Sequence, residues 1–583
     1  MGGANWEGVE SEIAETVRRL SQGYLQNAEN VPDEIESWAS QERLTWLGGY
    51  EGRTIHELIQ NGADEILRWV EDPTKKSFKS GEIRVVLTTS ALYCANEGRP
   101  LTERGVRTLM STNLSDKTGN EIGRFGVGFK ALLQVSDRPE IYSTTGSLRF
   151  DRRRSLREFG RIFSGSLEIE RVPVLRVAEP IDPEEAFAGD PVLAELKDWG
   201  ASTIVRLPLK TRKVGGLRAD LAGFEREFLL FSPHVSSLIL DDRAAKTPTR
   251  EITLEIEESS NGKVRPSEGE TTWSGTILLE EGGDRVPHLV ATRVHEPSRD
   301  AIEQGGDMGR KLVPVTWAVS KGGPRVLGQF WAFFPTSYET TLRGILNAPW
   351  KTNQDRTQLL EGRFNDELLD VAAELVVENI PQLQKLWPDD CCQYLLRLPG
   401  RFSGPEPHNP ADRLISELVY RKGNTSKTLP NQDGELKVPT SLHLHPADPT
   451  EEAVQEWAKF PGRPKRYVHP DVQIGDRINK RARAARLIKP NNEQMVPENL
   501  TTWLEALVEV KTPEASLAAM RVAAILLPTL TANKRPEVLQ AKIVLTKGNK
   551  FVPPKPGTVF IPGSFDAVEG TVYVHPELAK EAN

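Results

Sequence analysis

The stretch ELIQNGADE, which runs from Glu57 to Glu65, constrains the fold of this chain more than any other segment. In an α-helix Glu57, Asn61 and Asp64 stand at positions i, i+4 and i+7, so the three side chains share one stripe. A solvated stripe would normally carry Lys and Arg among the acids. This one is therefore interpreted as lining a site that needs oxygen ligands. Apolar residues bury much of the rest of the helix: Ile55, Leu58, Ile59, Ala63, Ile66 and Leu67.

The length and composition point to a protein of several domains with ordinary globular character. At 583 residues the chain exceeds what one core supports, so three or four domains are expected. The net charge of -8 argues against a surface that coats nucleic acid along its whole length. No apolar run of membrane-spanning length and no secretory signal is found, and a cytoplasmic location is predicted. The three cysteines form neither a disulfide framework nor a zinc site.

The order of helical and strand-like segments predicts an α/β multidomain protein with four parts. Residues 1–240 alternate helices and strands with long glycine-containing loops, which is typical of an α/β sandwich. Residues 241–385 form a second α/β domain, the middle domain. Residues 386–490 and 491–583 each combine helices with a short β-rich unit, in a mixed C-terminal region.

These last two parts contain an internal duplication. The sequence DGELKVP at 433–439 is echoed by KGNKFVP at 547–553. YVHPDV, which begins at Tyr467, is echoed by YVHPEL, which begins at Tyr573. Because the two landmarks recur in the same order, we expect two related β-rich units separated by helices.

A glycine-rich box follows the first strands. In EIGRFGVGFKALLQV, Gly123, Gly126 and Gly128 come just before a segment that is predicted to be helical. Glycines let the backbone approach a ligand closely, and the first N–H groups of a helix attract an anion. The order GxxGxG is neither the dinucleotide fingerprint nor a Walker A loop. Alone, the box is compatible with either a phosphate cradle or a tight structural turn.

Taken together, the boxes resemble those of the GHKL ATPases. The chain carries ExxxNxxD, then NxGxP, then GxFGxGF, then a threonine at the start of a strand, in that order. The likeness is closer to the sacsin-type, chaperone-like branch, through GGYEGRTIHELIQNGADE, NEGRPLT, GRFGVGFKALLQVSDRPEIYS and ILNAPWKTNQDRT. It covers about residues 45–385. The resemblance implies a Bergerat-type sandwich in 1–240 and a transducer-like middle domain.

The resemblance also assigns roles on the first helix and in the glycine box. It implies that Asn61 holds Mg²⁺, which bridges the phosphates of ATP, through its amide oxygen. Glu57 would be the general base for the attacking water, and Asp64 a structural partner of the pocket. In the alternative, Glu57 only pairs with Arg53 at i−4. The residues of the glycine box that would contact the nucleotide are Gly123, Phe125, Gly126, Val127, Gly128 and Phe129.

The box NEGRPLT departs from the family at its first residue. The family has an aspartate that accepts a hydrogen bond from the adenine amino group, whereas this chain has Asn96, followed by Gly98. A carboxamide can bond adenine in both directions but can also turn to suit guanine. If the register is shifted by one residue, Glu97 takes the place of Asn96. Thr203, in ASTIVRLPLK, matches the threonine that supports the base.

Two further groups would reach the phosphates. Lys117, in the segment 111–121 that the family uses as a lid, would neutralise phosphate charge, although a lysine in a polar loop is usually solvated. Arg356, three residues after Asn353 in the middle domain, would reach the γ-phosphate and make hydrolysis depend on domain docking. Lys351 is the alternative, because gyrase-type relatives use a lysine there.

The function expected from these boxes is an ATP- and Mg²⁺-dependent conformational switch that remodels a client protein or triggers an effector. The family commonly forms dimers, so a homodimer is expected, and no membrane partner is. A nucleic-acid-linked defence or repair ATPase is one alternative, and a pseudo-ATPase scaffold is another. The first alternative rests on a basic patch, defined by Arg463, Lys465, Arg466, Arg477, Lys480, Arg481, Arg483, Arg486 and Lys489.

Overall fold

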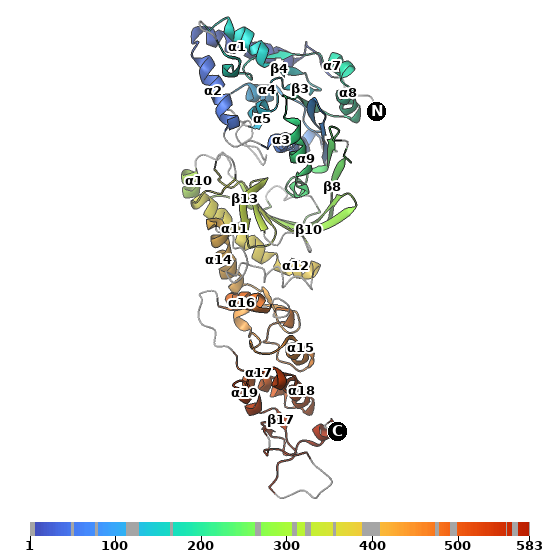
Figure 1. The fold of residues 1–583 in the computed structure, drawn as a ribbon, viewed down its shortest axis with the longest axis vertical. Helices are drawn as coiled ribbons and strands as arrows, with labels where there is room; N and C mark the ends of the chain where they lie inside the picture. The colour runs from blue at the N-terminus through green and yellow to red at the C-terminus, as the bar shows by residue number, and fades with distance from the viewer. Residues whose placement is uncertain are drawn as a thin grey trace. The chain divides into compact units, whose positions relative to one another are not determined.

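The computed structural model shows a mixed α/β protein of more than one part (Figure 1). It describes residues 6–47, 52–75, 78, 80–111, 128–163, 167–245, 247–262, 270–305, 312–320, 328–353, 357–387, 409–472, 477–489, 498–555, 557–561 and 570–581. Backbone contacts divide the chain into two compact units. Unit 1 comprises 1–324, 329–338 and 344–368, and unit 2 comprises the remainder.

The helices of the N-terminal region alternate with strands, as the sequence predicts. The helices up to the end of the second α/β part are α1 (Glu12–Asn30), α2 (Glu34–Leu47), α3 (Thr54–Glu71), α4 (Glu103–Met110), α5 (Gly128–Ala131), α6 (Arg152–Gly160), α7 (Pro183–Gly189), α8 (Pro191–Trp199), α9 (Val214–Ala222), α10 (Arg299–Gly305), α11 (Arg363–Glu378) and α12 (Ile380–Leu386).

Fourteen strands within the described residues belong to one sheet. They are β1 (Gly81–Leu87), β2 (Ala91–Asn96), β3 (Glu140–Ser143), β4 (Leu148–Phe150), β5 (Ala178–Pro180), β6 (Thr203–Pro208), β7 (Val235–Asp242), β8 (Arg250–Ser259), β9 (Thr272–Glu281), β10 (Asp284–His295), β11 (Val313–Ser320), β12 (Gly328–Trp331), β13 (Pro335–Thr340) and β14 (Ile345–Asn347). The order is β13-β12-β14-β11-β10-β9-β8-β7-β1-β2-β6-β3-β4-β5. Because β1 runs parallel to β7 while β2 and β6 are antiparallel, the sheet is mixed.

Strand β2 shows how both faces of this sheet are covered. Successive side chains of a strand point to opposite faces. Leu92 and Cys94 join the core cluster that contains the apolar side of α3, whereas Tyr93 and Ala95 join a second cluster that contains α7 and α8. The first cluster also includes Trp273 and Ile277 on β9, from the part of the sheet that follows residue 240. A single core therefore runs through both halves of unit 1.

Unit 2 contains two short β units with matching pairings. The hairpin β15 (Leu429–Pro430) with β16 (Leu436–Lys437) precedes the bridges Asn431–Val468 and His443–Tyr467. The hairpin β17 (Val544–Leu545) with β18 (Phe551–Val552) precedes the bridges Thr546–Val574 and Phe560–Tyr573. In both units the first bridge is antiparallel and the second is parallel. The repeated sequence landmarks thus coincide with a repeated pairing scheme.

The helices of unit 2 lie between and around these β units. They are the part of α11 from Leu369 onward, α12, α14 (Pro410–Thr425), α15 (Glu451–Lys459), α16 (Arg477–Ile488), α17 (Leu500–Leu507), α18 (Pro513–Thr529), α19 (Arg535–Gln540) and α20 (Pro576–Glu581). Within the described part of the chain, no helix has both the length and the apolar character needed to cross a membrane.

Candidate functional site

Helix α3 carries the predicted polar stripe and packs against β1, β2 and α5. Glu57 and Asp64 are 5% and 1% exposed, and Asn61 is partly buried. The helix approaches the sheet closely because position 62 is glycine. A Cβ atom at Gly62 would lie 3.2 Å from the Asn96 Cβ. The stripe and the end of strand β2 are therefore brought into the same region of unit 1.

The ends of three neighbouring strands place three polar side chains in one row. Asn96 on β2 is the register partner of Thr203 on β6, and Thr203 is the partner of Ser143 on β3. Register partners in antiparallel strands lie on the same face of a sheet. The Ser143 and Thr203 hydroxyl oxygens are 3.1 Å apart, and Ser143 Oγ also accepts from the Leu101 N–H at 2.9 Å. The structure thus brings the predicted pair together and adds Ser143, which the sequence reading missed.

The side-chain amide of Asn96 is left unsatisfied. Asn96 is 6% exposed, and its Nδ2 has no hydrogen-bond partner among the described residues. Its backbone oxygen, in contrast, accepts from both the N–H and the hydroxyl of Ser202, each at 3.0 Å. Leaving a buried donor unpaired costs about 1–3 kcal/mol, so native proteins seldom do so without a reason. The row therefore contains a donor that is available to a ligand.

The two residues after Asn96 have structural roles. Gly98 permits the close approach of this turn to α3, because a Cβ atom there would lie 2.8 Å from the Ile66 nitrogen. Glu97 Oε2 accepts from the Glu82 N–H at 3.0 Å, so this carboxylate holds the backbone of β1. Burial raises the pKa of Glu97. Glu97, the alternative to Asn96, is therefore already engaged with the protein.

The glycine box is described only at its end. Lys117, Gly123, Phe125, Gly126 and Val127 lie outside the described residues, as does Arg356. Gly128 begins α5, and Phe129 is buried with its ring 6.0 Å from that of Phe150. A helix follows the box, as the sequence predicts. Helix α5 has four residues and continues as a 3-10 turn through Leu132–Gln134, before the β-branched Val135 and a polar turn.

A group of buried charges connects the elements on either side of the box. Arg176 is 0% exposed; its guanidinium donates to the Met110 backbone oxygen at the end of α4 and lies 5.3 Å from the Tyr24 ring. Glu42, on α2, accepts from the backbone N–H groups that precede Arg176, and burial raises its pKa. Lys130 on α5 is 4% exposed, and burial, with Arg176 as a second cause, lowers its pKa to about 8. No periodicity in the sequence marks these residues as buried.

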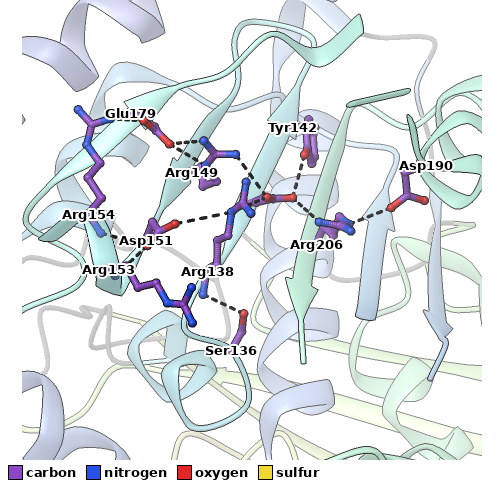
Figure 2. A network of polar contacts seen from close by, with 11 residues as sticks. Ser136, Arg138, Tyr142, Arg149, Asp151, Arg153, Arg154, Glu179, Asp190 and Arg206 are labelled. Carbon is purple, nitrogen blue, oxygen red and sulfur yellow. Dashed lines mark hydrogen bonds and ion pairs between the residues drawn. The ribbon is translucent and has the colours of Figure 1, made fainter. Parts of the chain in front are cut away.

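The opposite face of the same strands carries a network of paired charged and polar side chains (Figure 2). Its centre is Glu140 on β3, whose carboxylate is 4% exposed. Glu140 accepts from Arg206 at 2.7 Å and from the Tyr142 hydroxyl at 2.9 Å, and Arg138 lies 3.4 Å away. Arg206 continues the network to Asp190, which also accepts from the Tyr93 hydroxyl. These contacts tie β2, β3 and β6 together behind the row of polar side chains.

In the loop after β14, the asparagine before the predicted arginine is well held. Asn353 Oδ1 accepts from the backbone N–H groups of Thr357 and Gln358, at 2.9 and 3.0 Å. The alternative Lys351 donates its ammonium to the Gln304 backbone oxygen at 3.1 Å. In the described parts of this loop, side-chain hydrogen bonds therefore hold the backbone on both sides of position 356.

Several members of the basic patch in unit 2 pair with the protein's own groups. Lys465 lies 2.7 Å from Asp433, and Arg466 lies 2.5 Å from Glu509. Arg463 donates to the side chain and backbone of Gln432. The Arg486 guanidinium stacks 4.5 Å from the ring centre of Tyr420. These contacts are typical of residues that stabilise the surface they lie on.

Comparisons with known proteins add little to this geometry. No protein-family model and no curated protein matches the chain. One solved structure, described as the crystal structure of the N-terminal domain of a DNA repair protein, aligns with 59% of this chain and 99% of its own length. The identity is 11% and the TM-score is 0.27, which is too low to support an argument about fold or function.

Proposed function

We propose that this protein is an ATP- and Mg²⁺-dependent ATPase of the GHKL class, in the sacsin-like, chaperone-like branch, and that it acts as a conformational switch. In this proposal residues 1–240 form a Bergerat-type nucleotide-binding sandwich, and the following α/β part acts as a transducer. The observation that carries the proposal is the unsatisfied amide of Asn96, in register with Thr203 and packed against α3 at Gly62.

The row of three side chains is suited to the edge of a nucleobase. Asn96 supplies a buried amide that can donate and accept, as carboxamides do with adenine. The hydroxyl oxygens of Thr203 and Ser143 are 3.1 Å apart, and Ser143 also donates to the Ser202 backbone oxygen at 3.1 Å. The Thr203 hydroxyl can therefore donate to a base or to a water beside it. Because an amide can turn, this row should discriminate between adenine and guanine less strongly than an aspartate would.

The donor set of α3 fits magnesium bound together with a nucleotide. No cluster of three or more His, Cys, Asp or Glu side chains within the described ranges could hold a metal by itself. Mg²⁺ commonly takes one or two protein oxygens and completes its shell with phosphates and water. Asn61 would provide such an oxygen, and the bound ion would neutralise phosphate charge. Glu57, buried one turn away, would accept the proton of the attacking water.

Phosphate contacts in the proposal come from the glycine box, Lys117 and Arg356. Domain docking through Arg356 would couple hydrolysis to a change of shape, which the protein would use on a client protein or an effector, as a homodimer. The ion pairs that several members of the basic patch make in unit 2 give no specific support to a nucleic-acid role. DNA and RNA are therefore added to the hydrolysis assay, to see whether either of them stimulates turnover.

The test is nucleotide binding and hydrolysis by the full chain with Mg²⁺. We expect calorimetry to detect ATP binding and a phosphate assay to detect turnover, both depending on Mg²⁺. Asn61→Ala should lose the Mg²⁺-dependent part of the affinity. Binding without turnover would indicate the scaffold alternative, and turnover that rises only with DNA or RNA would favour the defence or repair role. Absence of binding would contradict the proposal.

A further inference from the structure

A second unsatisfied amide lies on α3. Gln60 is 0% exposed, and both its Nε2 and its Oε1 are buried without a hydrogen-bond partner in the described part of the chain. Gln60 precedes Asn61, three residues after Glu57 and four before Asp64. It was not among the residues that the sequence reading selected.

Helix geometry places Gln60 beside the polar stripe. At about 100° per residue, its side chain is about 60° from Glu57 and about 40° from Asp64 around the helix axis. Gly62, which faces the sheet at Asn96, is about 160° away from Gln60 by the same count. The amide therefore lies at the edge of the polar stripe, beside the two buried carboxylates and away from the strands.

Packing alone does not explain a glutamine at this position. Each unpaired buried polar group costs about 1–3 kcal/mol, and Gln60 has one donor group and one acceptor unpaired. Methionine would fill a similar volume without either penalty. An unsatisfied polar group that a native structure retains calls for an explanation, and a ligand or water that completes it during function is one.

We propose that Gln60 orients the attacking water in the hydrolytic reaction. This inference rests on the proposed function. The water oxygen bonds to the γ-phosphorus, the bond from that phosphorus to the bridging oxygen of ADP breaks, and Glu57 takes the proton. Gln60 accepts a hydrogen bond from this water through Oε1 and donates through Nε2 to an oxygen beside it. Its amide is chemically unchanged at the end of the turnover.

The decisive variant is Gln60→Met, compared with wild type in turnover, ATP affinity and thermal midpoint. We expect turnover to fall by about 10²-fold, on the scale of losing one oriented hydrogen-bonding group. The Kd for ATP should stay within about threefold, since the amide acts on water. The thermal midpoint should rise, because two unpaired polar atoms leave the interior. A purely structural glutamine would not give lower turnover together with higher stability.

A matched control separates the two effects. Ser155 on α6 is also 0% exposed with its hydroxyl unpartnered among the described residues, and it lies outside the site. Ser155→Ala should raise the thermal midpoint and leave turnover unchanged. Wild-type turnover in Gln60→Met, or a lowered midpoint, would overturn the role of Gln60 alone. A wild-type chain that hydrolyses no ATP would overturn the proposed function and this inference with it.

Discussion

The two faces of the strands β2, β6 and β3 differ in how well their buried polar groups are hydrogen-bonded. On the face toward α3, the Asn96 amide nitrogen is buried without a partner among the described residues. On the other face, Glu140 is buried to a similar degree but is surrounded by Arg206, Tyr142 and Arg138 (Figure 2). The same three strands therefore carry one polar group that lacks a bond and one that has several.

This difference separates stability from function within one sheet. The paired network around Glu140 holds the strands in register, and its loss should lower mainly the stability of the fold. An unsatisfied amide weakens the fold slightly and is retained where a ligand completes it. Substitutions on the two faces should therefore have opposite signatures, with activity changing on one side and stability on the other.

The largest effect is expected at Glu57. Glu57→Ala should lower the rate of ATP hydrolysis by about 10²–10⁴-fold, because the general base is lost, while ATP still binds. Stopped-time phosphate assays and calorimetry measure the two quantities on the same sample. Glu71→Ala, an exposed position at the end of the same helix, is the control and should hydrolyse normally. Normal turnover in Glu57→Ala would remove this residue from the mechanism.

On the face of the sheet opposite α3, Glu140→Gln should destabilise unit 1 by about 3–5 kcal/mol, because the surrounding arginines are left without their central carboxylate. Denaturant unfolding measures this loss, and turnover per folded molecule should be unchanged. Glu158→Gln offers a matched comparison, since its partner Arg161 is 74% exposed and such a surface pair contributes about 0–1 kcal/mol. Equal stability losses in the two variants would show that the network does not secure the strands.

The stability of the fold should also depend on pH through a buried histidine, His288. His288 on β10 is 5% exposed, its Nδ1 lies 2.9 Å from the Val286 backbone oxygen, and burial lowers its pKa to about 4. An unfolded histidine titrates near pH 6.5, so below that pH the unfolded chain binds more protons. Stability should therefore fall as the pH drops from about 6.5 to 4, by up to about 3 kcal/mol from this group.

The difference between wild type and His288→Gln isolates this contribution, because other groups titrate equally in both proteins. Unfolding midpoints at pH 7, 5.5 and 4.5 should converge for the two proteins as the pH falls, since the wild type alone loses the His288 contribution. Parallel pH profiles would show that His288 is not the group responsible.

The smallest effect concerns base selectivity. Asn96→Asp restores the residue that the GHKL family has at this position. We expect the preference for ATP over GTP to rise by about tenfold, which corresponds to about 1.4 kcal/mol. Competition of GTP against labelled ATP measures the ratio in both proteins. An unchanged ratio would mean that Thr203, Ser143 or another group selects the base.

The sequence could predict the parts of the site that depend on local pattern. Glu57, Asn61 and Asp64 share a stripe because the segment is helical, and the structure places that helix at Thr54–Glu71. Asn96 and Thr203 were selected by motif, and the strand register brings them opposite each other. The mixed α/β character also followed from the alternation of helical and strand-like segments.

What the sequence could not predict depends on contacts between distant segments. Ser143 joins the row only because β3 pairs with β6 in one register, and nothing in EIYS marks it. Arg176 and Gln60 look like ordinary surface residues in a linear pattern, yet both are 0% exposed. The sequence predicts a helical segment after the glycine box, but it does not show that α5 gives way to a 3-10 turn after four residues.

The central claim is that the unpaired Asn96 amide forms a hydrogen bond with the base of a bound nucleotide. The variant Asn96→Leu tests this claim most directly. The thermal midpoints of wild type and variant should be measured with and without Mg²⁺-ATP. Without nucleotide, the variant should be at least as stable as wild type, since an unpaired donor is removed. With ATP at 100-fold over its Kd, wild type should gain about 2.7 kcal/mol, and the variant little. An equal gain in both proteins would contradict the account.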